Sequence, residues 1–216
     1  MSESAYMTSS DILDELITRY PHLDFLKNDI ASAVDMLNAC WSEGGMLMTC
    51  GNGGSCADSG HIVGELMKCF KLSRPIDRIT ADALREYAGG EEIASKLEGA
   101  LPAISLCAQA PLMTAFMNDS DSSLVFAQQV YGYGRPGDVL MAISTSGNSR
   151  NCVAAAITAK AKKMNVIALT GKNESRLSEI SDISIRVPET ETFKIQELHL
   201  PVYHAICAMA EADNFR

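Results

Sequence analysis

A glycine-rich turn early in the chain has the composition of an anion-binding site. Residues 50–56 read Cys-Gly-Asn-Gly-Gly-Ser-Cys; they follow an apolar stretch over residues 46–49 and precede an amphipathic helical pattern over residues 57–70. Glycines let the backbone approach a ligand closely, and a helix N-terminus presents N–H groups and a positive dipole end to an anion. Asn52, Gly53, Gly54 and Ser55 are therefore candidate ligand-binding residues.

A second turn of the same kind comes later in the chain. An apolar run over residues 138–144 predicts a buried strand, and a helical pattern over residues 151–164 follows it. The hydroxyl groups between them belong to Ser144, Thr145, Ser146 and Ser149. Hydroxyl groups and a glycine at a helix N-terminus suit a phosphate monoester, although a hydroxyl-rich helix cap without a ligand is the alternative. Two such turns in one small domain predict the binding of a phosphorylated sugar.

A further group of residues could move protons or hold a metal ion. His61 and Glu65 are four residues apart in the helical pattern after the first turn, so they lie on one helix face. The last helical pattern carries Gln196, Glu197, His199 and His204. Histidine suits acid–base catalysis near neutral pH, and histidine with carboxylate and amide groups also suits Zn²⁺. A simple surface hydrogen bond is the alternative for the His61/Glu65 pair.

The spacing in the last helix limits which side chains can act together. His199 and His204 are five residues apart, hence on different faces, and are not expected to share one task. Gln196 and His204 are eight residues apart, roughly 12 Å along a helix. Both can line an elongated site, but sharing one metal ion would need long side chains or help from a neighbouring chain.

The composition excludes several classes of protein. The net charge of −9 argues against nucleic acid as a partner, because phosphate backbones are bound by basic surfaces. No apolar run reaches the length of a membrane span, and the N-terminus lacks the basic start and apolar core of a signal peptide, so no membrane association is expected. The seven scattered cysteines predict reduced thiols in a cytoplasmic protein.

Strand-like and helical patterns alternate along most of the chain. The apolar runs that predict buried strands cover residues 46–50, 103–107, 139–144, 166–170 and 183–187. This alternation predicts a single doubly wound α/β domain over residues 1–216, with ligands at the carboxyl ends of the strands. Residues 1–44 add helices that we expect to serve an oligomer interface, residues 71–99 form a polar insertion, and a long helix is expected over residues 192–212.

These motifs together resemble the phosphoheptose isomerases of the SIS (sugar isomerase) domain family. The resemblance runs in order from about residue 45 to residue 204. Its motifs are the turn at residues 50–55, His61 with Glu65, Asn118-Asp119, residues 137–139 and 143–149, Leu-Thr-Gly at 169–171, residues 186–192, and Gln196 with His199 and His204. The serine-rich turns are typical of the wider SIS family, whereas the His61/Glu65 and Gln196/His204 pairs are more specific to the isomerases.

The resemblance implies a three-layer α/β/α sandwich around a five-stranded parallel sheet, N-terminal helices that build a homotetramer, and active sites between subunits. It implies that sedoheptulose 7-phosphate is converted through an enediol to an aldose, D-glycero-D-manno-heptose 7-phosphate, for nucleotide-activated heptose in lipopolysaccharide or another glycan. Glu65 would be the base, and His204 would move protons on the oxygens. Substrate would contact Asn52, Gly53, Gly54, Ser55, Glu65, Asn118, Asp119, Ser144, Thr145, Ser146, Ser149 and Gln196. One Zn²⁺ per subunit would be held by His61, Glu65, Gln196 and His204.

Two departures from the family pattern leave other functions open. The segment over residues 71–99 is longer than is common, and Gln109-Ala110-Pro111 stands where the family often has Asp-x-Ser. An isomerase of another phosphosugar is therefore one alternative. A non-catalytic scaffold resembling the DnaA-initiator-associating protein is another, but it would not need His61, Glu65, Gln196 and His204. A phosphosugar-sensing regulator would normally carry a DNA-binding module, which this acidic chain does not suggest.

Overall fold

The computed structural model describes residues 7–215, so the first six residues of the predicted N-terminal element lie outside the described part, as does residue 216 of the predicted domain. A five-stranded parallel sheet forms its centre, with strand order β2-β1-β3-β4-β5. The strands are β1 (Leu47–Cys50), β2 (Ala103–Ser105), β3 (Val139–Ile143), β4 (Asn165–Thr170) and β5 (Ile183–Arg186). Each lies at one of the five apolar runs predicted to be strands, which confirms the expected α/β class.

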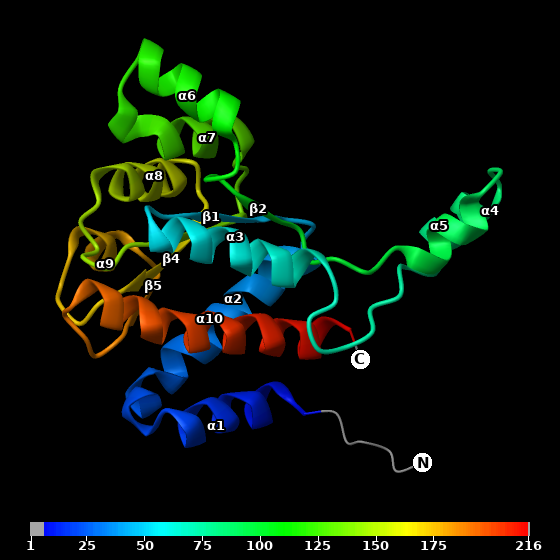
Figure 1. Ribbon diagram of the computed structural model, residues 1–216, viewed down its shortest axis with the longest axis horizontal. Helices are drawn as coiled ribbons and strands as arrows, with labels where there is room; N and C mark the ends of the chain where they lie inside the picture. The colour runs from blue at the N-terminus through cyan, green and yellow to red at the C-terminus, as the bar shows by residue number, and fades with distance from the viewer. Residues whose placement is uncertain (1–6, 216) are drawn as a thin grey trace.

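Helices cover both faces of the sheet and make the three layers visible in Figure 1. The helices ahead of the sheet are α1 (Ser9–Arg19), η1 (Pro21–Leu26) and α2 (Lys27–Ser42). Those within the alternating region are α3 (Gly54–Met67), α4 (Arg78–Arg85), α5 (Gly90–Lys96), α6 (Ala110–Asp119), η2 (Ser122–Leu124), α7 (Val125–Tyr133), α8 (Arg150–Ala161) and α9 (Arg176–Ile180). The chain closes with α10 (Thr192–Asn214).

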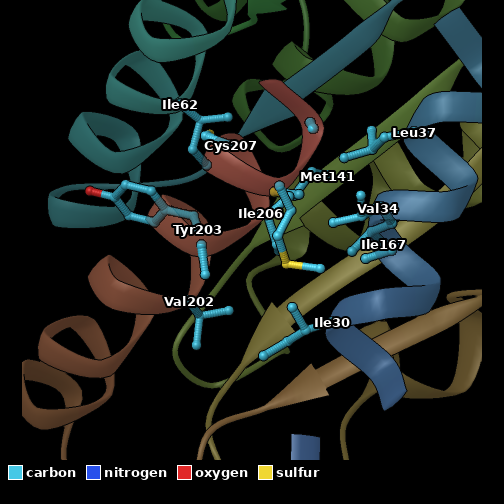
Figure 2. Close-up of a cluster of buried hydrophobic side chains, with 14 of the residues drawn as sticks. Ile30, Val34, Leu37, Ile62, Met141, Ile167, Val202, Tyr203, Ile206 and Cys207 are labelled. Carbon is cyan, nitrogen blue, oxygen red and sulfur yellow. The ribbon is translucent and has the colours of Figure 1, made fainter. Parts of the chain in front are cut away.

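The two faces of the sheet follow from the alternation of side chains along each strand. In β3, Met141 and Ile143 face a core shared with α1, α2, α3 and α10, whereas Leu140 and Ala142 face a core shared with α7, α8 and α9. Figure 2 shows the first core, where α2 and α10 meet over the sheet. Both faces of the parallel strands are therefore buried, which explains their continuous apolar sequence.

Residues 71–99 leave the body of the domain as an arm that carries α4 and α5 (Figure 1). Its side chains are mostly exposed, and Ile79 and Tyr87 are among its exposed apolar residues. The base of the arm is fixed by a buried ion pair: Arg74 Nε donates to Glu211 Oε1 at 2.7 Å. Glu211 also accepts hydrogen bonds from the backbone N–H groups of Phe70 and Lys71. The arm thus leaves the body at a position fixed by hydrogen bonds to Glu211 of α10.

Candidate active site

The two glycine- and hydroxyl-rich turns meet at the centre of the sheet. Strands β1 and β3 are neighbours in the sheet, with Cys50 opposite Ala142, so the turns after them lie side by side. Side-chain amides join the two turns, because Asn52 and Asn151 exchange hydrogen bonds of 2.9 and 2.8 Å. The strand order also reverses between β1 and β3, which is where open α/β sheets bind their ligands.

The first turn enters α3 through a glycine in an unusual conformation. Gly53 is the N-cap residue of α3 with φ of 56° and ψ of −120°, a backbone shape that disfavours side chains. Ser55 lies in the first turn of α3 and is buried. A Cβ atom added to Gly54 would lie 2.6 Å from Nε2 of Gln196, so the amide of Gln196 packs directly against this glycine. The turn and the start of α10 are therefore in contact.

The second turn presents its hydroxyl groups beside a cavity. Ser144 Oγ and Ser149 Oγ are 2.9 Å apart, and Gly147 has φ of 64°. A cavity of about 300 Å³ opens next to this turn. It is lined by Thr145, Ser146, Asn148, Gly171, Lys172, Asn173, Glu174, Glu189, Thr190 and Ile195. The Lys172 side chain adds a cationic group to a turn that otherwise offers neutral donors.

Two histidines and a carboxylate from α3 and α10 converge at a single point. His61 Nε2 lies 3.0 Å from Glu65 Oε1 and 3.4 Å from His204 Nε2. One ligand atom from each of the three side chains lies within 4.8 Å of the others. The contact between α3 and α10 thus joins residues that are 143 positions apart in the sequence.

Neighbouring groups shift the pKa values of Glu65 and His204, the two side chains that the resemblance implies move protons. Burial raises the pKa of Glu65, but the nearby Lys68 and His61 outweigh burial and hold that pKa below its usual value. Lys68 Nζ donates to Glu65 Oε2 at 3.1 Å. The pKa of His204 is also lowered, first by burial and then by His61, while Glu65 opposes the shift. These environments favour a carboxylate at Glu65 and a neutral imidazole at His204 near neutral pH.

The donor set at this point suits a metal ion. Two imidazole nitrogens and a carboxylate are the ligand types that Zn²⁺ prefers, and they already face one another. Lone pairs on these atoms cannot satisfy each other without a proton or a cation between them. His61, Glu65 and His204 therefore fit a metal centre on the evidence of their geometry.

Gln196 lies away from this convergence along α10. It is eight residues from His204, roughly 12 Å along the helix axis, and it packs against Gly54 at the other end of the exposed face of α3. The geometry connects Gln196 with the first turn more directly than with the two histidines. His199, three residues after Gln196 on α10, is buried with its Nε2 atom 3.3 Å from the Thr170 carbonyl oxygen.

Asn118 and Asp119 are placed far from these groups. They are the last two residues of α6. Asn118 Nδ2 donates to Asp119 Oδ1 at 2.7 Å, and both residues are exposed. Helix α6 lies on the face of the sheet opposite α10 (Figure 1), so one chain does not bring this pair to His61 and His204.

A larger cavity lies on the other side of His204. Its volume is about 410 Å³, and apolar residues of α1 and α10 form much of its wall. The lining residues are Ile12, Glu15, Leu16, Arg19, Tyr20, Phe70, Lys71, Glu197, Leu200, Pro201, His204, Ala205 and Ala208. Of the histidine and carboxylate cluster, His204 therefore borders this cavity and could contact a molecule bound in it.

Three residues at the site were not singled out from the sequence. Lys172 could have been found because it directly follows the Leu-Thr-Gly run at the end of β4. Asp58 and Tyr203 form a hydrogen bond beside His61, and no sequence pattern indicates it. Burial raises the pKa of Asp58, although Tyr203 and His61 oppose the shift.

Comparisons with known proteins identify the family of this chain. The family model described as "SIS domain" matches residues 15–100 and 81–171. A phosphoheptose isomerase of Azoarcus sp. (strain BH72) is 36% identical over 197 residues, which are 90% of this chain and 88% of that protein. One from Shewanella baltica (strain OS155) is 34% identical with the same coverage.

Solved structures of phosphoheptose isomerases have the same fold. The one from Neisseria gonorrhoeae has a TM-score of 0.72 at 30% identity, with 92% of this chain and 94% of that chain covered. The one from Francisella tularensis has a TM-score of 0.73 at 30% identity, with 94% and 98% covered. The fold, the paired turns and the histidine and carboxylate cluster thus occur in a chain that belongs to the SIS domain family and, within it, to the phosphoheptose isomerases.

Proposed function

We propose that this protein is an aldose–ketose isomerase that converts sedoheptulose 7-phosphate to D-glycero-D-manno-heptose 7-phosphate. The observation that carries the proposal is the convergence of His61, Glu65 and His204, in a chain at least 30% identical to phosphoheptose isomerases over nine tenths of its length. The product would feed the synthesis of a nucleotide-activated heptose for lipopolysaccharide or another glycan.

The phosphate of the substrate binds at the second turn in this proposal. Thr145 and Ser146 line the cavity there, and Ser144 and Ser149 complete the set of hydroxyl donors. Lys172 lines the same cavity and supplies a positive charge. Asn52, Gly53, Gly54 and Ser55 bind the sugar chain from the adjacent first turn. Because Asn118 and Asp119 lie on the other face of the sheet, their predicted contact with sugar requires a neighbouring subunit's site.

The reaction is a proton transfer between two neighbouring carbons. The Glu65 carboxylate removes a proton from C1 of the ketose, and His204 donates a proton to the oxygen on C2, which gives the enediol. His204 then takes the proton from the oxygen on C1, and Glu65 returns its proton to C2. The lowered pKa of Glu65 keeps this side chain ionised near neutral pH, which is the form that accepts a proton.

His61, Glu65, Gln196 and His204 are the proposed ligands of one Zn²⁺ ion per subunit. The ion would supply positive charge that polarises the substrate carbonyl and stabilises negative charge on its oxygen. The three convergent side chains support this assignment, and Gln196 would join them only with a change of its side-chain position.

We further propose a homotetramer whose active sites lie between subunits. The open cavity beside His204 supports it, because apolar residues of α1 and α10 line a space that one chain leaves unfilled. Residues 1–44 supply the oligomer interface in this proposal, and residues 71–99 are an insertion that borders the sugar end of the site. Light scattering after size exclusion measures the assembly directly.

A cytoplasmic location is proposed from the thiols. The seven cysteines, all within the described part of the chain, are free. Over the same residues, no helix has both the length and the apolar character needed to cross a lipid bilayer.

A panel of phosphorylated ketoses tests the substrate assignment. Sedoheptulose 7-phosphate, fructose 6-phosphate and ribulose 5-phosphate would be supplied at equal concentrations while the aldose products are measured. We expect the highest kcat/KM with the heptulose. Equal or higher kcat/KM with a shorter ketose would assign the enzyme to another phosphosugar, and no turnover with any of them would favour a binding scaffold.

A further inference from the structure

A hydrogen-bonded chain of three side chains lies behind the histidine and carboxylate cluster. The Tyr203 hydroxyl group donates to Asp58 Oδ1 at 3.2 Å, and the hydroxyl oxygen of Tyr203 lies 3.0 Å from Nδ1 of His61. The other ring nitrogen of His61, Nε2, faces Glu65 and His204. Each ring nitrogen of His61 therefore has its own, distinct set of partners.

The chemistry of these groups limits the directions that their hydrogen bonds can take. A tyrosine hydroxyl has one proton, and a carboxylate can only accept. Because Tyr203 gives its proton to Asp58, its oxygen can only accept from His61. A neutral His61 ring carries one proton, so a hydrogen bond from Nδ1 to the Tyr203 oxygen at 3.0 Å competes with one from Nε2 to Glu65 Oε1 at 3.0 Å.

The position of Tyr203 in the core makes this chain rigid. The tyrosine is 1% exposed, and its ring packs at the edge of the cluster formed by Val202, Ile206 and their neighbours. Figure 2 shows its hydroxyl oxygen pointing out of that cluster. The ring of Tyr203 also contacts the rings of both histidines edge-on, with centroid distances of 5.5 and 5.0 Å. The packing around the Tyr203 ring thus holds its hydroxyl group next to His61.

One carboxylate oxygen of Asp58 lacks a hydrogen bond, so the carboxylate depends on the hydrogen bond that Tyr203 donates. Within the described residues, its Oδ2 atom is buried without a hydrogen-bond partner, so Tyr203 is the donor that compensates this carboxylate. Asp58 is also on α3, one turn before His61. A buried carboxylate without donors loses the hydrogen bonds that water would give it. Asp58 therefore favours keeping the hydrogen bond from Tyr203, which directs the tyrosine proton away from His61.

We propose that Tyr203 and Asp58 are positioning residues that hold the proton of His61 on Nδ1 and direct the lone pair of Nε2 toward Glu65 and His204. Hydrogen bonding at the far nitrogen is how histidine ligands of metal ions are oriented and made more basic. The effect on metal affinity rests on the zinc site of the proposed function. The position of the His61 proton does not rest on it.

Two variants test the proton position in metal-free protein. Tyr203→Phe removes the acceptor for Nδ1–H, and Asp58→Ala leaves the tyrosine free to donate to Nδ1. In both, we expect the proton of His61 to move to Nε2, where Glu65 Oε1 at 3.0 Å can accept it. Nitrogen-15 chemical shifts of labelled histidine at about pH 8, where imidazoles are mostly neutral, report the position of the proton.

The exposed Tyr131 supplies the matched control, Tyr131→Phe. Wild type and this control should show His61 protonated on Nδ1. The inference is overturned if wild-type His61 carries its proton on Nε2, or if every one of these two variants that folds keeps the proton on Nδ1. Since Asp58→Ala leaves the buried ring in place, a folding failure of Tyr203→Phe would not remove the test.

The affinity for Zn²⁺, measured by competition with a chelating dye, tests the consequence. We expect Tyr203→Phe to bind Zn²⁺ roughly 10- to 100-fold more weakly than wild type and Tyr131→Phe. Unchanged affinity would show that the hydrogen bonds do not support metal binding. Wild-type protein that binds no Zn²⁺ but carries the His61 proton on Nδ1 would refute the zinc site alone and leave the positioning role intact.

Discussion

His61 Nε2 lies 3.4 Å from His204 Nε2, although one residue is on α3 and the other on α10. The contact depends on the packing of both helices against the same face of the sheet, where Ile62 and Cys207 belong to one buried cluster. Each histidine is adjacent in sequence to a residue of that core: Ile62 follows His61, and Tyr203 precedes His204. The reactive groups are therefore fixed by the most buried part of the molecule.

Glu65→Gln should abolish isomerisation while substrate still binds. The amide has nearly the same shape as the carboxylate but cannot accept the proton from C1, and such a loss typically reduces the rate by at least about 10²-fold. Steady-state kinetics and calorimetric titration with the product would measure the two effects. Glu179→Gln, at an exposed ion pair on α9, is the control and should remain active. Normal turnover by Glu65→Gln would show that Glu65 is not the base.

Ser146→Ala and Lys172→Met should weaken substrate binding more than they slow the reaction. Both side chains line the cavity at the second turn, and a hydrogen bond to a charged group contributes about 1.5–3 kcal/mol. We expect KM to rise about 10-fold or more in each variant, with a smaller change in kcat. Ser95→Ala, on the exposed α5, provides the comparison. If KM stays at the wild-type value in both variants, the phosphate binds elsewhere.

His199 should make the protein less stable in mild acid. Burial lowers the pKa of His199 to about 4 from the usual 6.5, with the Thr170 carbonyl opposing the shift. Between pH 6.5 and 4 the unfolded chain binds a proton that the folded protein rejects, so the free energy of unfolding falls as the pH falls. The loss across this range is about 3 kcal/mol.

Urea unfolding of wild type and His199→Leu at several pH values checks this expectation. The variant lacks the titrating ring, so its stability should fall less steeply between pH 6.5 and 4 than that of wild type. Parallel pH dependences of the two proteins would mean that His199 takes up a proton in the folded state.

Breaking the buried Arg74–Glu211 ion pair should destabilise the fold. Both side chains are at most 1% exposed, and Arg74 also donates to the backbone carbonyls of Leu66 and Glu65 at 2.8 and 3.1 Å. Removal of one partner leaves the other charge buried, which typically costs about 3–5 kcal/mol. Arg74→Met should show this loss in urea unfolding.

The double variant Arg74→Met with Glu211→Leu separates the charge from the packing. It leaves no buried charge, so its stability should exceed that of Arg74→Met alone. Equal losses in the single and double variants would assign the effect to the capping of α3 by Arg74.

The sheet was predictable because both of its faces are buried. Runs such as Val139 to Ile143 are apolar at every position, and the strand boundaries in the structure differ from the predicted ones by one or two residues. The arm over residues 71–99 was recognised as polar, but α4 and α5 were not predicted. These helices have only eight and seven residues and are mostly exposed, so they lack the long apolar stripe by which the other helices were recognised.

The candidate site was less predictable because its contacts are long-range. The i,i+4 spacing of His61 and Glu65 placed them on one face, but only the packing of α10 on α3 brings His204 to them. That Tyr203 uses its hydroxyl group to orient His61 depends on a contact between residues 142 positions apart. Asn118 and Asp119 came from the resemblance alone, and their contact with substrate stays a prediction.

The most direct test is the conversion of sedoheptulose 7-phosphate by metal-free protein, with and without added Zn²⁺. Appearance of the aldose would be followed with a coupled assay. The proposed function predicts turnover that depends on Zn²⁺ and is lost in Glu65→Gln. Absence of turnover in both conditions would contradict the assignment, whereas equal turnover with and without the ion would retain the isomerase and refute the role of zinc.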